Sequence, residues 1–486
     1  MNAPIRRLST VVAVLFAALL ISTTFIQFVE AKSINARSDN RRTLLSTYSR
    51  DRGQILVGDT PVAKSVPSND QYAYLRTYPK GPEYAHITGY YSFFGAAGGL
   101  ESAEQSLLSG SSDQLFYRRV SDLFTGRKPK GATLETTIDP AVQDAAEKAL
   151  GNQRGAAVAL DPKTGAILAL VSHPTYDPNA LASHDLTAVV NTSKKLESNP
   201  NRPLVDRAIA GDLYPPGSTF KVITAAAALS SGKFTPSTLI PGPAKLDLPQ
   251  TSVPLVNDFP SACGPNDKTS LDHALTISCN TAYGWLGMNL GAEAMNAQAA
   301  RFGFGDPLSI PMTVTPSVFP ADPNPPQLAQ SSIGQFDTRV TPLQMAMVAA
   351  GIANRGTVMK PYLVQSILGS DLQVIDSAQP TQLSQAVTPE VAAELTDMMI
   401  NVVRQGTGTA AQISGVTVAG KTGTAQHGTG LPPHAWFIAF APADSDPKIA
   451  VAVVVEDGGN AGNEAVGGRV AAPIAKAMIE ARLKKS

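Results

Sequence analysis

Residues 218–221 read STFK, and two further motifs follow them in order along the chain, SCN at residues 278–280 and KTG at residues 421–423. Each motif is weak alone, because decoys of all three occur elsewhere in the chain in turns, polar stretches or helix ends. The specific signal is the ordered set, with each member in suitable local surroundings. The three motifs therefore indicate one chemical centre that the fold must assemble from distant segments.

The first motif supplies a nucleophile and the group that activates it. Residues three apart share a helix face, so we expect Lys221 to lie over Ser218. Burial lowers the pKa of a lysine, and a neutral Lys221 can take the proton of the Ser218 hydroxyl. Ser218 is expected in the first turn of a buried helix that reaches about residue 229, where unpaired backbone N–H groups favour negative charge.

The other two motifs supply polar groups around this nucleophile. Ser278 is placed to pass a proton between Lys221 and a leaving nitrogen, and Asn280 to bond a substrate amide. Lys421 supplies a fixed cation for a carboxylate or for polarising Ser278, on a predicted strand edge along which a substrate strand can add. The residues expected to bind substrate on that strand are Thr422, Gly423 and Thr424.

Composition bounds the other functions of the chain. Its 486 residues can form two or three domains. Lys plus Arg and Asp plus Glu both number 39, so net charge gives no indication of nucleic acid binding. The chain has no phosphate loop or dinucleotide fingerprint, and its six histidines show no ligand spacing. We therefore expect neither a cofactor nor a metal.

The N-terminus predicts a membrane anchor. Residues 8–29 carry no charge, and about 20 apolar residues suffice to cross a bilayer. Arg6 and Arg7 precede this run and place residues 1–7 in the cytoplasm. A cleaved signal peptide is the alternative, although its apolar core is usually only about 7–15 residues long. Either way, the chain after about residue 30 lies outside the cytoplasm.

The two cysteines, Cys263 and Cys279, are disulfide candidates, since an extracytoplasmic location permits a bridge. A bridge would stabilise the fold by about 3 kcal/mol in the chain-entropy model. It would pin the second motif against residues 236–267, a Pro- and Asp-rich segment expected to wrap the surface. Two buried free thiols remain the alternative.

Hydrophobic patterning divides the rest of the chain. Residues 33–150 are polar and rich in Gly and Tyr, and we interpret them as a pedestal domain. Residues 151–486 hold the chemical centre, and their first and last strands are expected to pair in one sheet. The fold class is therefore α/β, with an antiparallel sheet flanked by helices on the pedestal and one N-terminal transmembrane helix. The predicted strands are 156–160, 166–171, 435–441 and 449–456.

The chain resembles the class B penicillin-binding proteins, the monofunctional transpeptidases, over nearly its whole length. Cys279 within the second motif and the compact pedestal look most like the actinobacterial penicillin-binding protein A group. One departure is Phe336, which follows Gly334 and Gln335 where the family often has glycine. The matching stretches are RGQI at 52–55, YPPGSTFK at 214–221, TPLQMA at 341–346, GTGT at 406–409 and AGKTGTA at 419–425.

The resemblance implies a penicillin-recognising serine transpeptidase fold and a peptidoglycan D,D-transpeptidase. A D-Ala-D-Ala stem-peptide donor would acylate Ser218 with loss of D-Ala, and an amine of a neighbouring strand would then attack the ester. The backbone N–H groups of Ser218 and Thr424 would form the oxyanion hole. β-Lactams would be inhibitors, and a membrane glycan polymerase of the SEDS type and other cell-wall assembly proteins would be partners.

Three alternatives differ in what happens at Ser218. A β-lactamase would need a glutamate to activate water, and none lies between Glu293 and Glu390. A D-Ala-D-Ala carboxypeptidase differs only in using water as the acceptor. A cell-wall assembly scaffold would keep the pocket without using it, and each motif taken singly could be a helix cap, a turn or a solvated strand end.

Overall fold

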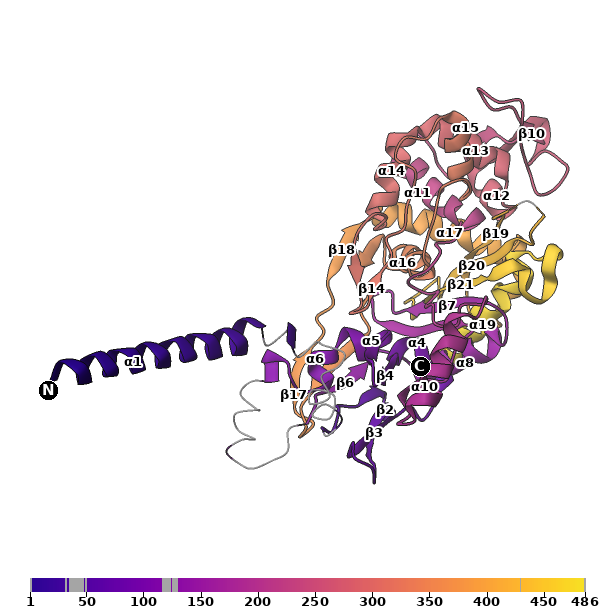
Figure 1. Cartoon of the computed structure of the whole chain (residues 1–486). Coiled ribbons are helices and arrows are strands. Elements are labelled where there is room, and N and C mark those ends of the chain that lie inside the picture. The colour runs from indigo at the N-terminus through magenta and orange to yellow at the C-terminus, as the bar shows by residue number, and fades with distance from the viewer. Residues whose placement is uncertain are drawn as a thin grey trace.

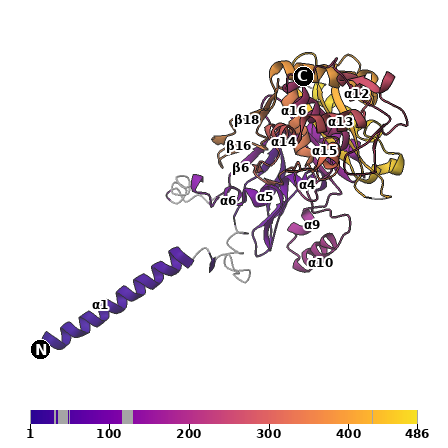
Figure 2. The same cartoon turned by 90° about the horizontal axis from the view of Figure 1, so that it is seen from above.

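The structure is a computed structural model that describes residues 2–30, 33–34, 48, 50–115, 124, 130–428 and 430–484. A long N-terminal helix projects from a body that holds two sheets (Figure 1). Figure 2, seen from above, shows the same separation of the helix from the body.

The projecting helix matches the predicted anchor in length and composition. α1 (Asn2–Thr24) continues as a π-helical turn, Phe25–Glu30. The span Ala3–Glu30 has 28 residues and a mean hydropathy of 2.3, and none of its apolar window is buried against the rest of the chain. It is therefore long and apolar enough to cross a membrane, and it includes residues 8–29.

The pedestal is built on a six-stranded sheet in the order β17-β16-β6-β1-β2-β3. β16 and β17 come from far along the chain, and β16 pairs antiparallel with β6. The expected division at residue 150 therefore does not separate the two sheets. The strands are β1 (Ile55–Val57), β2 (Thr60–Pro67), β3 (Tyr74–Thr77), β6 (Thr133–Thr136), β16 (Val364–Leu368) and β17 (Val374–Ser377).

Short elements pack on this sheet around a buried charge cluster. Glu101, with no exposed surface, accepts hydrogen bonds from Arg52 Nε at 2.5 Å and Arg76 Nε at 2.6 Å. The first residue of the RGQI stretch, Arg52, thus forms an ion pair that links the segment before β1 to the helix that contains Glu101. The elements are α4 (Gly81–Thr88), β4 (Tyr90–Ser92), β5 (Gly95–Ala97), α5 (Gly99–Ala103), α6 (Gln105–Leu108) and a 3₁₀ turn, Asp113–Leu115.

The second sheet is antiparallel throughout, in the order β19-β20-β21-β7-β8. β21 pairs with β7, which confirms the predicted pairing of the first and last strands of this part of the chain. β19, which carries the KTG motif, lies at one edge. The strands are β7 (Gly155–Leu160), β8 (Ile167–His173), β19 (Ala419–Ala425), β20 (His434–Ala441) and β21 (Ile449–Val455).

The two faces of this sheet bury alternate residues of the same strands, because side chains alternate along a strand. α8 (Pro140–Leu150) and α19 (Ala472–Leu483) cover one face, and α11 (Lys221–Ser230) and α16 (Pro342–Ala353) lie on the other. On the face covered by α8 and α19, cross-strand neighbours with buried side chains are Ala157, Phe437 and Val453. On the face covered by α11 and α16, they are Val158, Ile438 and Ala452.

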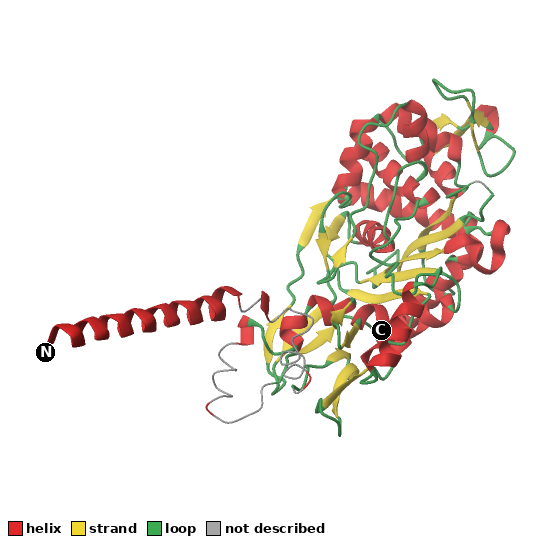
Figure 3. Cartoon of the chain, viewed as in Figure 1, coloured by secondary structure: helices red, strands yellow, loops and turns green. Residues whose placement is uncertain are grey.

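The helices that carry the first two motifs gather beyond one face of this sheet, as Figure 3 shows in red. Residues 271–290 form helix, loop and helix. Near the C-terminus, Ala471 separates α18 (Gly467–Val470) from α19. The remaining longer helices are α12 (Leu271–Thr276), α13 (Asn280–Leu290), α14 (Ala292–Arg301), α15 (Pro325–Ser331) and α17 (Pro389–Gln405).

Smaller elements complete the described chain. α9 (Asn179–Ala182) and α10 (Leu186–Glu197) follow β8. The short paired strands are β9 (Leu239–Pro241) with β12 (Lys268–Ser270), β10 (Lys245–Leu246) with β11 (Leu255–Val256), β13 (Leu308–Ser309) with β14 (Thr313–Val314), and β15 (Thr357–Met359) with β18 (Gln382–Gln385). Further 3₁₀ turns are Gly217–Phe220, Pro265–Asp267, Thr409–Ala411 and Glu456–Glu464.

Gln143 of α8 closes the outer edge of β8, and its loss should destabilise the fold. Its amide accepts from Leu170 N at 2.9 Å and donates to Leu170 O at 3.1 Å, and the side chain is fully buried. Gln143→Ala leaves both backbone groups without these partners, so we expect the free energy of unfolding to fall by about 1–3 kcal/mol. Urea unfolding of the full-length protein in detergent measures this loss. Gln373→Ala, at an exposed position, is the control, and equal stability of the two variants would contradict the prediction.

Candidate active site

Ser218 lies in the 3₁₀ turn Gly217–Phe220, which leads directly into α11, so the serine stands just ahead of the α-helix that was predicted to contain it. The preceding segment is held on two sides. Tyr214 exchanges backbone hydrogen bonds of 3.0 and 2.8 Å with Val340, and Trp436 Nε1 donates to Pro215 O at 3.0 Å. The backbone immediately before Ser218 is therefore held in place by hydrogen bonds from two other segments.

Gly217 lets this turn lie against the KTG strand. Its φ of +54° is in the left-handed region, and a Cβ there would lie 2.6 Å from the carbonyl oxygen of Thr424. A side chain at this position would therefore push Ser218 away from β19, and only glycine allows the close approach.

The two motif lysines converge on one hydroxyl, that of Ser278. Lys221 Nζ donates to Ser278 O and to Asn280 Oδ1, both at 2.7 Å, and approaches Ser278 Oγ at 3.3 Å. Lys421 Nζ donates to Ser278 Oγ at 2.9 Å. Because a hydroxyl has two acceptor lone pairs and one proton, Ser278 can accept from both amines and direct its own proton toward a substrate.

Ser218 and Lys221 lie in consecutive turns of the chain, but no hydrogen bond joins their side chains. Ser218 is 7% exposed, and its hydroxyl forms no hydrogen bond with any residue that the structure describes. Lys221 instead bonds to the second motif. The structure thus joins four of the predicted catalytic residues, Lys221, Ser278, Asn280 and Lys421, by hydrogen bonds, and Ser218 lies in the turn that leads into Lys221.

Burial controls the charge of both lysines, which have no exposed surface. Desolvation lowers the pKa of Lys221 from 10.5 to about 7, against a smaller opposing effect of Asp258. Desolvation also brings the pKa of Lys421 well below its usual value, and repulsion from Lys221 adds to this lowering. Burial therefore disfavours a positive charge on either amine, and repulsion between the two amines disfavours a charge on both at once.

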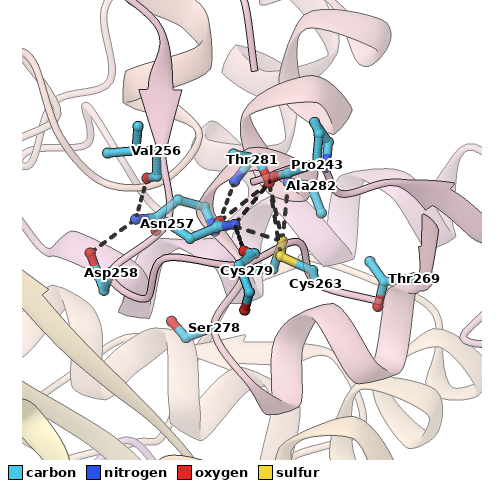
Figure 4. Close-up of a disulfide and its surroundings, with 12 residues drawn as sticks. Pro243, Val256, Asn257, Asp258, Cys263, Thr269, Ser278, Cys279, Thr281 and Ala282 are labelled. Atoms are coloured by element: carbon cyan, nitrogen blue, oxygen red, sulfur yellow. Dashed lines mark hydrogen bonds between the residues drawn. A yellow bond between two sulfur atoms is a disulfide. The ribbon is translucent and has the colours of Figure 1, made fainter. Parts of the chain in front are cut away.

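The loop of the second motif is held in an uncommon conformation. Ser278 has a φ of +63°, which costs energy for a residue with a side chain. A disulfide joins Cys279 to Cys263, as Figure 4 shows. Asn257 Oδ1 accepts from the backbone N–H groups of Asn280 at 3.0 Å and Thr281 at 3.1 Å. These contacts over-determine the loop and keep Ser278 between the lysines.

Sequence patterning missed Asn257 and Asp258, because residues 236–267 were expected to wrap the surface. The segment does lie mostly at the surface, but it also forms the β10–β11 ladder and contacts the second motif. Asn280 Nδ2 donates to Val256 O and to Asp258 Oδ1, both at 3.1 Å. The only signal in the sequence is the nearness of these residues to Cys263, which the disulfide fastens to the second motif.

The predicted substrate-binding residues lie on β19, and the described chain places no strand against its outer edge. The turn that carries Ser218 packs closely against β19, since a Cβ on Gly423 would lie 2.9 Å from Pro216 O. Thr422 Oγ1 lies 2.6 Å from Thr407 Oγ1, so the GTGT stretch supports this strand from behind. Thr424, further along, is half-buried.

A cleft of about 500 Å³ beyond β19 brings His427, His434 and Asp457 together, with ligand atoms within 4.8 Å of one another. Histidine spacing in the sequence did not reveal this cluster. The two rings stack with centroids 3.7 Å apart and an angle of 4° between their planes. An imidazole binds a metal in the plane of its ring, and parallel stacked rings share no such position. The cluster in this arrangement does not fit a metal.

Comparisons with known proteins agree with this geometry. The model of the penicillin binding protein transpeptidase domain matches residues 155–480. The model of the penicillin binding protein A dimerisation domain matches residues 52–134. The chain belongs to the class B penicillin-binding protein transpeptidases.

Whole-length relatives of the family include the peptidoglycan D,D-transpeptidase PbpA of Mycolicibacterium smegmatis, which is 47% identical over 100% of both chains. PbpA of Mycobacterium tuberculosis is 45% identical over 100% of this chain and 99% of its own. The solved ceftriaxone acyl-enzyme of penicillin-binding protein A from M. tuberculosis superposes with a TM-score of 0.87, at 45% identity, over 90% of this chain and 100% of that one.

Phe336, the departure from the family pattern, adopts a backbone conformation that favours glycine. Phe336 has a φ of +56°, the region that glycine enters without cost. Gly334 O accepts from Gly217 N at 2.9 Å, so this loop still supports the serine turn. The phenylalanine carries a cost of about 1–2 kcal/mol that a glycine would not.

The pKa of about 7 for Lys221 predicts how the rate of Ser218 acylation by penicillin depends on pH. The acylation rate with penicillin should rise through this value, because only the neutral amine can take the serine proton, and should level off above it. Stopped-flow acylation of the full-length protein in detergent measures the profile. Lys221→Arg should abolish acylation, and Lys233→Arg, at an exposed position, should leave the profile unchanged. A rate that rises only near pH 10.5 would contradict the prediction.

Proposed function

We propose that the protein cross-links peptidoglycan stem peptides through an acyl-enzyme on Ser218 formed from D-Ala-D-Ala donors, and that β-lactams inhibit it by forming the same ester. One observation carries this proposal. Two fully buried amines, those of Lys221 and Lys421, converge on the Ser278 hydroxyl beside the turn that holds Ser218. Acyl transfer needs a nucleophile, a base that removes its proton and a group that passes the proton on, and Ser218, a neutral Lys221 and Ser278 can fill these roles.

In the acylation step, the donor peptide adds along the free edge of β19 near Thr424. Lys221 takes the Ser218 proton as Oγ attacks the penultimate carbonyl carbon, and the backbone N–H groups of Ser218 and Thr424 hold the oxyanion. The C–N bond breaks and the leaving D-Ala nitrogen receives a proton through Ser278. Lys421 and Thr422 hold the terminal carboxylate, and Asn280 bonds the donor amide.

In the second step, an amine of a neighbouring stem peptide attacks the ester carbonyl. The same groups act in reverse, so that the C–Oγ bond breaks, a new amide forms, and Ser218 regains its proton from Lys221. With water as the acceptor the identical step gives a carboxypeptidase. The choice between amine and water therefore depends on what lies around the acyl-enzyme.

We also propose the cellular arrangement. The tail, residues 1–7, is cytoplasmic, residues 8–29 anchor the chain in the membrane, residues 33–150 act as the pedestal, and residues 151–486 form the transpeptidase domain outside the cytoplasm. An apolar helix of 28 residues and a disulfide beside the active site support this orientation. A SEDS-type glycan polymerase and other wall-assembly proteins are the proposed partners, as the family resemblance implies.

Intact-mass measurement tests the proposed function most simply. The full-length protein incubated with penicillin should gain the mass of one drug molecule, and the adduct should persist because the site is built for an amine acceptor. Ser218→Ala should remove the gain, and Ser230→Ala, in the exposed decoy motif at the end of α11, should retain it. Absence of an adduct would contradict the mechanism. Rapid turnover of the drug would assign a β-lactamase instead, and release of D-Ala from stem peptides without cross-linked product would assign a carboxypeptidase.

A further inference from the structure

Asp258 places a negative charge at the boundary between the buried active site and solvent. The residue is exposed, whereas Asn280 is buried. Its Oδ1 accepts from Asn280 Nδ2 at 3.1 Å, and Asn280 Oδ1 in turn accepts from Lys221 Nζ at 2.7 Å. The carboxylate is thus two hydrogen bonds from the proposed base, and its charge acts on both Lys221 and Lys421.

The position of Asp258 is fixed by its surroundings. The preceding residue, Asn257, is buried and donates to Pro243 O at 3.3 Å and Ser261 O at 3.1 Å. The disulfide fastens Cys263 to the loop that carries Ser278, and Figure 4 shows Asp258 beside this loop. Asp258 is therefore held against the second motif rather than free to swing across the surface.

One oxygen of this carboxylate is unused. Oδ1 holds the Asn280 amide, while Oδ2 accepts no hydrogen bond from the residues that the structure describes. Asp258 acts electrostatically on two lysines, Lys221 and Lys421, and both are fully buried. A cation that approaches from solvent would therefore meet an exposed carboxylate that has one unused oxygen and lies two hydrogen bonds from Lys221.

We propose that Asp258 determines acceptor specificity by binding the ammonium group of the incoming stem-peptide amine through its free oxygen, and so favours amines over water. This inference rests on the proposed transpeptidase function. Amines are cations in neutral water, so a carboxylate attracts and orients them, while an uncharged water molecule gains nothing. A D-Ala-D-Ala donor and a penicillin are anions, so Asp258 gives them no such advantage.

The transfer step balances with the groups present. The ammonium held by Asp258 releases one proton to solvent, and its neutral nitrogen attacks the ester carbonyl carbon. The C–Oγ bond of the acyl-enzyme breaks as the new C–N bond becomes an amide. The second nitrogen proton passes through Lys221 to Oγ of Ser218.

Partitioning of a D-alanyl thioester donor tests the role of Asp258 in the full-length protein. The measured quantity is the ratio of amide product to hydrolysed product, with Nα-acetyl-lysinamide as a cationic acceptor and hydroxylamine as a neutral one. Asp258→Asn keeps an oxygen for Asn280 and removes only the charge. It should lower the ratio for the cationic acceptor by about threefold to tenfold and leave the ratio for hydroxylamine unchanged. Raised salt should bring the unsubstituted protein toward the variant, since salt screens an exposed charge.

Asp247→Asn is the matched control, because it removes an exposed carboxylate from the same segment and should leave every ratio unchanged. An equal fall for both acceptors in Asp258→Asn would show a structural role and overturn the inference. An unchanged ratio for the cationic acceptor with normal thioester turnover would overturn it as well, while the proposed function would stand. Failure of the unsubstituted protein to turn over the thioester through Ser218 would overturn the proposed function and this inference together.

Discussion

The burial of two lysines around one serine hydroxyl is the constraint on which the rest of the active site depends. A charged amine without water is costly, so burial favours the neutral form of Lys221 and makes it a base at physiological pH. The same burial requires hydrogen-bond partners for both amines, and Ser278 and Asn280 provide them. The contacts that stabilise the buried amines are therefore also the contacts on which the proposed mechanism depends.

The rest of the fold keeps this arrangement in place. Alternating side chains bury both faces of the second sheet, which fixes β19 and its free edge. Gly217 allows the serine turn to lie against β19, and the disulfide and Asn257 hold the second motif. The three motifs therefore come from three segments that are each held by their own contacts.

Period-two patterning predicted the strands of the second sheet, and the short motifs named four residues that the structure joins by hydrogen bonds, because both depend on local sequence. Residues 236–267 lie mostly at the surface, as expected, but the β10–β11 ladder and the contact of Asp258 with Asn280 depend on pairing between distant residues and were not predicted. Residues 364–377 join the pedestal sheet through pairing with β6, which no local pattern reveals. The His427 cluster likewise forms only when the ends of β20 and β21 meet. Long-range pairing is what the sequence leaves undetermined.

Direct titration of the Lys221 side chain tests the central claim. The full-length protein in detergent, labelled with ¹³Cε-lysine, would be followed by NMR across the neutral and alkaline range, and the Lys221 signal assigned by its loss in Lys221→Arg. The account predicts a pKa of about 7 for this amine. A midpoint near the ordinary value of 10.5 would mean that Lys221 is a cation at neutral pH, and would contradict its role as the base that activates Ser218.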